Sequence, residues 1–146
     1  MIKVISVGKI KEKELTTLIS NYSKQLKNFV IVEVADGKSE VDMEKEGERI
    51  LSHINPNDYV IGLMIKGSQY DSVEFAHKID KIMTYQSPDI CFVIGGSYGI
   101  DKKVIERFND SISFSKMTLP HQLMRLVLVE QIYRSQMILK NHPYHK

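Results

Sequence analysis

The middle of the chain holds an apolar run that ends in a glycine-rich turn, Ile90-Cys91-Phe92-Val93-Ile94-Gly95-Gly96-Ser97-Tyr98-Gly99. A short, continuous apolar run of this kind favours a strand that is covered on both faces. Tyr59–Ile65 is a second such run, and Gly67 follows it. Strands buried on both faces are typical of parallel sheets with helices on each side. The two runs therefore predict an α/β fold.

Further strands and helices alternate along the chain before and after these runs. We expect other strands at 2–7, 30–34 and 111–115, and helices at 14–29, 42–54, 73–85, 101–108 and 121–140. Ser72 is the expected N-cap of the third helix. No linker or internal repeat interrupts the pattern, and 146 residues is an ordinary size for one domain. We predict a single domain over residues 1–146, with a mainly parallel sheet and helices on both faces.

The last expected helix, 121–140, is apolar around most of its circumference. Its apolar residues are Leu123, Met124, Leu126, Val127, Leu128, Val129, Ile132, Met137, Ile138 and Leu139. A helix of this kind must be buried on nearly all sides. An outer helix of a small monomer usually keeps a face in solvent, so we expect a homodimer that buries this helix.

Composition narrows the class of protein. Hydrophobic residues make up 42% of the chain and charged residues 26%, as in globular domains. Cys91 is the only cysteine, which rules out a disulfide within the chain, and its apolar neighbours predict a buried side chain. No apolar run approaches the ~20 residues needed to cross a bilayer, and the N-terminus does not resemble a signal peptide. We expect a cytoplasmic protein with no membrane contact.

Charge is distributed unevenly along the chain. Residues 1–30 carry six basic and two acidic side chains, and residues 111–146 carry five basic and one acidic, so each end has a net charge of +4. The intervening residues carry nine basic and fifteen acidic side chains, a net charge of −6. A basic face would form if the fold brings the two ends together, and it would suit nucleic acid. An unevenly charged, solvated surface is an equally good interpretation of the charges alone.

The familiar signatures of nucleotide and metal sites are absent. The turn after Ile94 matches neither the P-loop pattern nor the G-x-G-x-x-G pattern of dinucleotide sites. Gly96–Gly99 matches the G-x-x-G of KH domains, but it follows a buried strand, which is the wrong context. His121, His142 and His145 do not follow a zinc-binding pattern, so we expect no metal.

Two longer motifs resemble the SPOUT methyltransferases: Phe92-Val93-Ile94-Gly95-Gly96-Ser97-Tyr98-Gly99 and Ser113-Phe114-Ser115-Lys116-Met117-Thr118-Leu119-Pro120-His121-Gln122-Leu123-Met124-Arg125. Two others look like one family among them, the ribosomal RNA large subunit methyltransferase H family of pseudouridine N3-methyltransferases: Glu130-Gln131-Ile132-Tyr133-Arg134 and His142-Pro143-Tyr144-His145-Lys146. The resemblance runs essentially from end to end. The one departure is the stretch near Ser39–Glu44, which is shorter than the acidic region of the family.

This resemblance implies a C-terminal trefoil knot, the SPOUT fold, in which the last helix threads a loop of the chain. It also implies S-adenosylmethionine as the methyl donor. The expected cofactor-binding residues are Leu63, Gly95, Phe114, Ser115, Lys116, Met117, Thr118 and Leu119. The adenine would lie among apolar side chains and accept hydrogen bonds from the backbone of 114–119.

The implied reaction is methylation of N3 of a pseudouridine in large-subunit (23S) ribosomal RNA, on assembled ribosomes. Histidine suits a proton transfer near neutral pH, and we expect His145 to be the base or to position the base. Arg134 would stabilise the uracil oxyanion or a phosphate, and Tyr144 would stack on the base or hold it. The alternative for Arg134 is a helix-surface salt bridge with Glu130, four residues earlier. His121 is expected to cap or pack.

Two other functions remain open on the sequence. A non-catalytic ribosome-associated factor with the knotted fold would have a degraded cofactor segment, whereas Phe114–Pro120 matches the family pattern. An α/β enzyme that acts on a small molecule through a bound nucleotide would carry a phosphate- or dinucleotide-binding motif, and the sequence has none.

Overall fold

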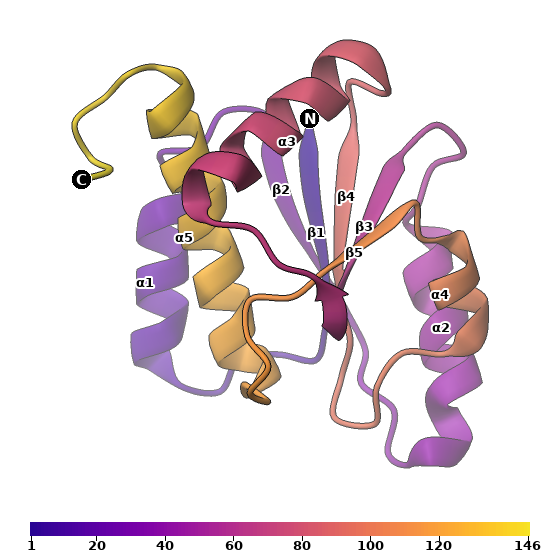
Figure 1. The fold of residues 1–146 in the computed structure, drawn as a ribbon. Coiled ribbons are helices and arrows are strands. Elements are labelled where there is room, and N and C mark those ends of the chain that lie inside the picture. The colour runs from indigo at the N-terminus through magenta and orange to yellow at the C-terminus, as the bar shows by residue number, and fades with distance from the viewer.

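Figure 1 shows a computed structural model of the chain, which describes every residue from Met1 to Lys146. The elements follow in the order β1 (Ile2–Val7), α1 (Lys13–Ser23), β2 (Phe29–Val34), a 3₁₀ turn (Glu40–Asp42), α2 (Met43–Ser52), β3 (Tyr59–Ser68), α3 (Ser72–Tyr85), β4 (Ile90–Ile94), α4 (Lys102–Arg107), β5 (Asp110–Ile112) and α5 (His121–Leu139). All five expected strands and all five expected helices are present.

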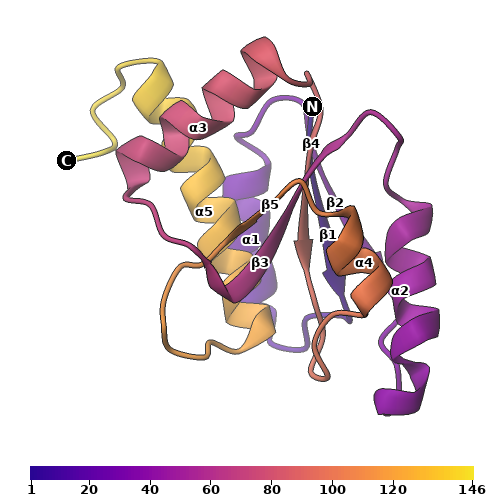
Figure 2. The same ribbon diagram turned by 45° about the vertical axis from the view of Figure 1, so that its right-hand side comes forward.

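The five strands form one sheet in the order β2-β1-β4-β3-β5, and every neighbouring pair runs parallel. Helices α1, α3 and α5 cover one face of this sheet, and α2 and α4 cover the other (Figure 2). The prediction of a parallel α/β sheet with helices on both faces is confirmed. Because all strands run the same way, the loops that follow β1, β3, β4 and β5 gather at one edge.

Each face of the sheet has its own apolar core. Ile61 and Phe92 point toward α3 and α5, where they pack with Phe75 and Leu128. On the other face, Ile5, Cys91 and Val93 pack with residues of α2 and α4. The alternation along β4 places Phe92 on one side and its two neighbours on the other, as the pleat of a strand requires. All five residues of β4 are buried, which is why its sequence is continuously apolar.

Cys91 is fully buried at the centre of the sheet, as its apolar neighbours predicted. Burial raises the pKa of its thiol to about 12, because the charged thiolate is poorly solvated inside the protein. The side chain therefore serves as a small apolar residue and stays protonated at neutral pH.

Several expected boundaries are wrong. The helix expected over 14–29 ends at Ser23. The chain then turns through Asn28, whose φ of 51° is incompatible with a right-handed α-helix. The strand expected over 59–65 continues to Ser68, where its register with Ile112 shifts. The strand expected over 111–115 ends at Ile112 instead.

The expected N-cap of α3 is also wrong by one residue. Asp71, not Ser72, caps the helix by accepting a hydrogen bond from the Glu74 amide at 2.7 Å, and the Glu74 side chain accepts one from the Asp71 amide at 3.1 Å. This reciprocal pair is a capping box. Ser72 is thereby free to donate from its hydroxyl to Gln131 Oε1 on α5 at 2.7 Å.

Helix α5 is covered mainly by its own chain. It lies between α1 and α3 and against the sheet, so Leu128, Val129 and Ile132 are fully buried in a single chain (Figure 1). The flanking helices thus supply much of the cover that its apolar sequence demands. Leu123 and Leu139 stay exposed, at 38% and 39%. The C-terminal knot remains a prediction from the family resemblance.

Candidate functional site

A cavity of about 190 Å³ lies at the edge of the sheet where β3, β4 and β5 end. We call it the strand-end cavity. Its walls come from three segments that are far apart in the sequence, and most of the lining is apolar. The lining residues are Leu63, Met64, Ile65, Ile94, Gly95, Gly96, Gly99, Ile100, Ile112, Ser113, Phe114, Ser115, Met117, Thr118, Leu119, His121 and Met124.

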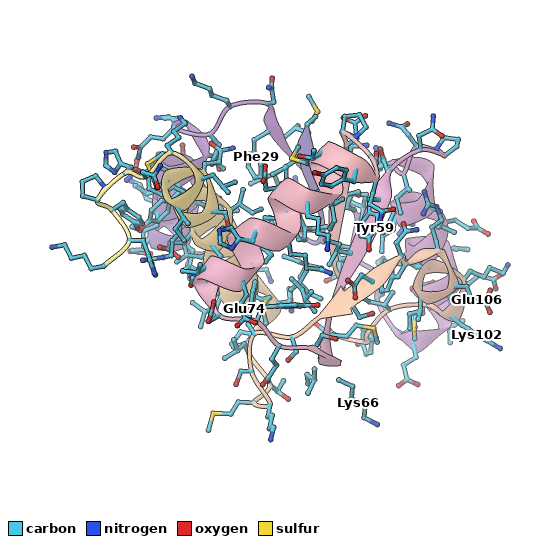
Figure 3. All side chains as sticks on the ribbon, turned by 45° about the horizontal axis from the view of Figure 1, so that its top comes forward. Phe29, Tyr59, Lys66, Glu74, Lys102 and Glu106 are labelled. Atoms are coloured by element: carbon cyan, nitrogen blue, oxygen red, sulfur yellow. The ribbon has the colours of Figure 1, made fainter.

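Seven of the eight residues expected to bind a cofactor line this one cavity. They are Leu63, Gly95, Phe114, Ser115, Met117, Thr118 and Leu119. The eighth, Lys116, is exposed and does not line it. Lys66, the residue of β3 that follows the lining residue Ile65, is also exposed and points away from the protein (Figure 3). Exposed lysines therefore neighbour the apolar lining residues along the chain.

Gly95 follows β4 directly and leaves no room for a side chain. A Cβ built at this position would lie 2.5 Å from Cγ1 of Ile100 and 3.1 Å from the Gly99 oxygen. Ile100 itself lines the cavity. Glycine is therefore required for the turn 95–100 to fold back on β4 and form this wall.

Serine hydroxyls hold the segment 113–119 in its shape. Ser113 Oγ donates to the Ser115 oxygen at 2.8 Å, and Ser115 Oγ accepts from the Met117 amide at 2.9 Å. The backbone N–H groups of Lys116, Thr118 and Leu119 donate to no group of the protein. This loop therefore offers backbone N–H groups as hydrogen-bond donors beside an apolar cavity.

A second group of polar side chains gathers where the C-terminal tail folds back on α5. Glu130 Oε1 accepts from Arg134 Nη2 at 2.6 Å and Nε at 3.0 Å, and from the Tyr144 hydroxyl at 2.9 Å. Arg134 Nη1 lies 3.1 Å from His145 Nδ1. We call Glu130, Arg134, Tyr144 and His145 the tail cluster. The salt bridge between Arg134 and Glu130, the alternative raised from the sequence, is present, but it is part of a larger network.

Aromatic contacts add to these hydrogen bonds. The Tyr144 ring packs edge-on against Tyr133 with ring centroids 4.8 Å apart, and the Arg134 guanidinium lies 4.8 Å from the Tyr144 centroid. Burial, with Tyr22 and Glu130 as neighbours, raises the pKa of Tyr144 above its usual range. Hydrogen bonding to Glu130 raises the pKa of Arg134. The tail therefore has a defined place on the protein, with Tyr144 protonated and Arg134 charged.

A second cavity of about 350 Å³ lies between the strand-end cavity and the tail cluster. We call it the adjoining cavity, because Ile112, Ser113 and Phe114 line both. Its other lining residues are Tyr70, Asp71, Ser72, Phe75, Val127 and Gln131. The hydrogen bond from the Glu74 amide chiefly lowers the pKa of Asp71, and an electrostatic effect of the nearby His145 side chain adds to this lowering. The start of α3 therefore lies within electrostatic reach of the tail.

These three features follow one stripe of α5. Met124 lines the strand-end cavity, Val127 and Gln131 line the adjoining cavity, and Arg134 belongs to the tail cluster. Val127, Gln131 and Arg134 follow Met124 by three, seven and ten residues, so all four lie on one face of the helix. The distance along the helix axis from the first to the last is about 15 Å. In a single chain the tail cluster therefore lines neither cavity, and Gln131 of the adjoining cavity is its nearest neighbour along this stripe.

Several residues in these sites were not identified from the sequence. Gln131 Nε2 donates to Glu130 Oε2 at 2.9 Å, so Ser72, Gln131 and Glu130 form a chain of hydrogen bonds from α3 to the tail. The i, i+4 spacing of Glu130 and Arg134 was visible, but not that Glu130 also holds Tyr144. His121 lines the strand-end cavity and makes no capping hydrogen bond, so of its two expected roles, capping and packing, only capping is wrong.

No helix is both long and apolar enough to span a membrane. No three or more His, Cys, Asp or Glu side chains are grouped as metal ligands would be.

Comparison with known proteins gives matches over the whole chain. Residues 1–145 match the family model described as a predicted SPOUT methyltransferase. A protein of Acholeplasma laidlawii named ribosomal RNA large subunit methyltransferase H is 55% identical over 145 residues, covering 99% of each chain. Proteins with the same name from Bacillus pumilus and from Latilactobacillus sakei subsp. sakei are 52% and 51% identical over 157 positions, again covering 99% of each chain. Because 157 positions exceed the 146 residues of this chain, these two relatives carry additional residues.

Proposed function

The chain belongs to the SPOUT methyltransferase family, and from this we propose that it methylates N3 of a pseudouridine in large-subunit ribosomal RNA with S-adenosylmethionine as donor. The observation that carries the proposal is the full-length identity of about half to proteins named for methylation of that RNA. The arrangement of the two cavities and the tail cluster supports it and suggests a role for each residue.

The strand-end cavity suits the adenosine part of the cofactor. Its apolar walls would enclose an adenine, and the free N–H groups of Lys116, Thr118 and Leu119 are suitable donors to the ring nitrogens. About 190 Å³ is small for the complete cofactor, so we assign this cavity to the adenosine part alone. Once bound, the cofactor supplies a methyl group that is already electrophilic, so the protein's task is placement.

His145 is better suited to position the base than to accept its proton. Arginine N–H groups only donate, so His145 Nδ1 must accept the contact from Arg134 Nη1 at 3.1 Å. In the neutral ring the hydrogen then lies on Nε2. A ring in this state has no free lone pair for a proton, but its Nε2–H can donate to a carbonyl oxygen of the uracil. We assign His145 this positioning role.

Arg134 and Tyr144 also have proposed roles in the reaction. Three of the five N–H groups of Arg134 are engaged by Glu130 and His145, and the others can stabilise negative charge on the uracil as N3 loses its proton. The bound cofactor would give up its methyl group from sulfur to N3, and the N3 proton would pass to water. Tyr144 holds Arg134 in place through its ring and through Glu130.

The surface charge suits an RNA substrate held in a larger particle. Helix α1 packs beside α5, and Lys27 and Lys140 line one shallow cavity, so the two basic ends of the chain lie together. The net charge of the chain is nevertheless only +2, which is modest for binding free RNA. We therefore propose the assembled ribosome as the substrate, which makes the protein cytoplasmic.

The test of this function is mass spectrometry of large-subunit ribosomal RNA from cells with and without the protein. We expect one modified uridine to lose a single methyl group when the protein is absent, and purified enzyme with S-adenosylmethionine to restore it. RNA with unchanged methylation would instead favour the alternative, a non-catalytic ribosome-associated factor.

We further propose that the enzyme is a homodimer whose interface includes the exposed side of α5. Leu123 is 38% exposed there, and Leu15 and Leu123 line a shallow cavity between α1 and the start of α5. Large apolar side chains left at the surface of adjacent helices are suited to burial against a second copy.

Leu123→Glu should convert the dimer to a monomer, because an unpaired carboxylate in an apolar interface costs several kcal/mol. Light scattering at micromolar concentration measures the change. Tyr85→Glu is the matched control, since Tyr85 is 79% exposed at the far end of α3 and should leave the mass unchanged. Leu128 cannot serve in this test because it is fully buried in the chain's own core. A wild-type protein that is monomeric would contradict the proposal.

A further inference from the structure

We propose that the adjoining cavity receives the target base and that Gln131 distinguishes pseudouridine from uridine there. This inference rests on the proposed function, because it assigns the binding site of the target base and the residue that recognises this base. The adjoining cavity shares three lining residues with the strand-end cavity, so a base held in it lies next to the cofactor.

The cavity has the walls that a flat aromatic base requires. Tyr70, Phe75 and Phe114 contribute three aromatic rings, and Phe75 and Phe114 meet edge to face with centroids 6.2 Å apart. Bases stack on such rings irrespective of their sequence. The volume of about 350 Å³ lies within the range of small-molecule sites. Stacking alone, however, cannot tell one pyrimidine from another.

Gln131 supplies an amide whose orientation is fixed. A carboxylate only accepts hydrogen bonds, so the group that faces Glu130 Oε2 at 2.9 Å must be the nitrogen of Gln131. The Gln131 oxygen then faces the Ser72 hydroxyl, which donates to it at 2.7 Å. One N–H and one oxygen lone pair of the amide are left over. Because Gln131 lines the cavity, these two groups are available to a ligand.

A donor beside an acceptor is the pattern that separates the two nucleosides. Pseudouridine is joined to its sugar through carbon, so its N1–H is free and lies beside the C2 carbonyl. In uridine, N1 carries the sugar and has no hydrogen. Gln131 can accept from N1–H and donate to the C2 oxygen of pseudouridine, and this pairing leaves N3 free to react. Uridine cannot form the first of these bonds and leaves the glutamine oxygen with one partner fewer.

The experiment compares methylation of ribosomal RNA that carries pseudouridine or uridine at the target position. Wild-type enzyme should prefer pseudouridine. Gln131→Leu should lower kcat/KM for pseudouridine about tenfold more than it lowers kcat/KM for uridine, and so remove the preference. Gln136→Leu is the matched control, because it makes the same change on the same helix, where the amide contacts only the Lys27 oxygen at 3.5 Å. It should keep the full preference.

Ser72→Ala gives a second, gentler variant in case Gln131→Leu disturbs the tail. It removes the donor that orients the Gln131 oxygen, and the preference should fall partway with unchanged cofactor affinity. A Gln131→Leu enzyme that retains the preference, or that loses activity equally on both substrates, would overturn the inference while leaving the proposed function intact. A wild-type enzyme that methylates neither substrate would overturn the proposed function itself.

Discussion

Removing Tyr144, His145 and Lys146 should abolish methyl transfer to ribosomes and leave S-adenosylmethionine affinity almost unchanged. The deletion takes away two members of the tail cluster and frees Glu130 and Arg134 from their partners in the tail. The strand-end cavity is lined by no residue after Met124, so it stays complete. Transfer of labelled methyl groups to ribosomes measures the first effect, and calorimetry with the cofactor measures the second.

Single substitutions separate the parts of this effect. His145→Ala should lower kcat more than it weakens ribosome binding, because its donated hydrogen bond matters most in the transition state. Lys146→Ala should do the reverse, with an effect that shrinks at high salt, as expected of a phosphate contact. If the shortened enzyme works at the normal rate, the tail cluster has no part in the reaction.

Gly95→Val should weaken S-adenosylmethionine binding at least tenfold in a protein that remains folded. Because Gly95 is expected to contact the cofactor, a side chain here would intrude on the ligand directly. The structure adds a second cause, because the new Cβ would lie 2.5 Å from Cγ1 of Ile100 and displace this wall of the strand-end cavity. Calorimetry gives the affinity, and thermal unfolding shows whether the fold survives.

A double variant distinguishes these two causes. Gly95→Ala should also weaken binding, and adding Ile100→Ala removes the atom that its Cβ would meet. If displacement of Ile100 is the cause, the two changes together should cost less affinity than the sum of the single changes. If intrusion on the ligand is the cause, the second change should restore nothing. Unchanged affinity in folded Gly95→Val protein would remove Gly95 from the site.

The elements whose burial is uniform were the easiest to predict from the sequence. β4 is covered on both faces, so its residues are continuously apolar and its bounds at Ile90–Ile94 were predicted exactly where the structure has them. Strand β5 is short and ends where Ser113 begins a turn held by its own hydroxyl, and no periodicity marks that point. Ser72 and Asp71 are both good N-caps, and only the reciprocal bond with Glu74 decides between them.

The candidate site was predictable only in part for a similar reason. Leu63, Gly95 and Phe114 lie together because parallel strands end at one edge of the sheet. This rule can be applied to the sequence alone. The adjoining cavity depends on contact between the start of α3 and the middle of α5, and their residues Ser72 and Gln131 are 59 positions apart. The apolar circumference of α5 predicted burial correctly, but it could not say how much of the cover comes from α1 and α3.

The single buried thiol makes the protein a reporter of its own unfolding. Thiol reagents attack the thiolate, and Cys91 lies on β4 between β1 and β3, so it can react only when the centre of the sheet opens. A ligand that binds only the folded protein reduces the open fraction in proportion to its saturation. The rate of alkylation at rising S-adenosylmethionine concentration therefore reports cofactor affinity without any methyl transfer. Binding can thus be measured even in variants, such as the shortened chain, that have no activity left to assay.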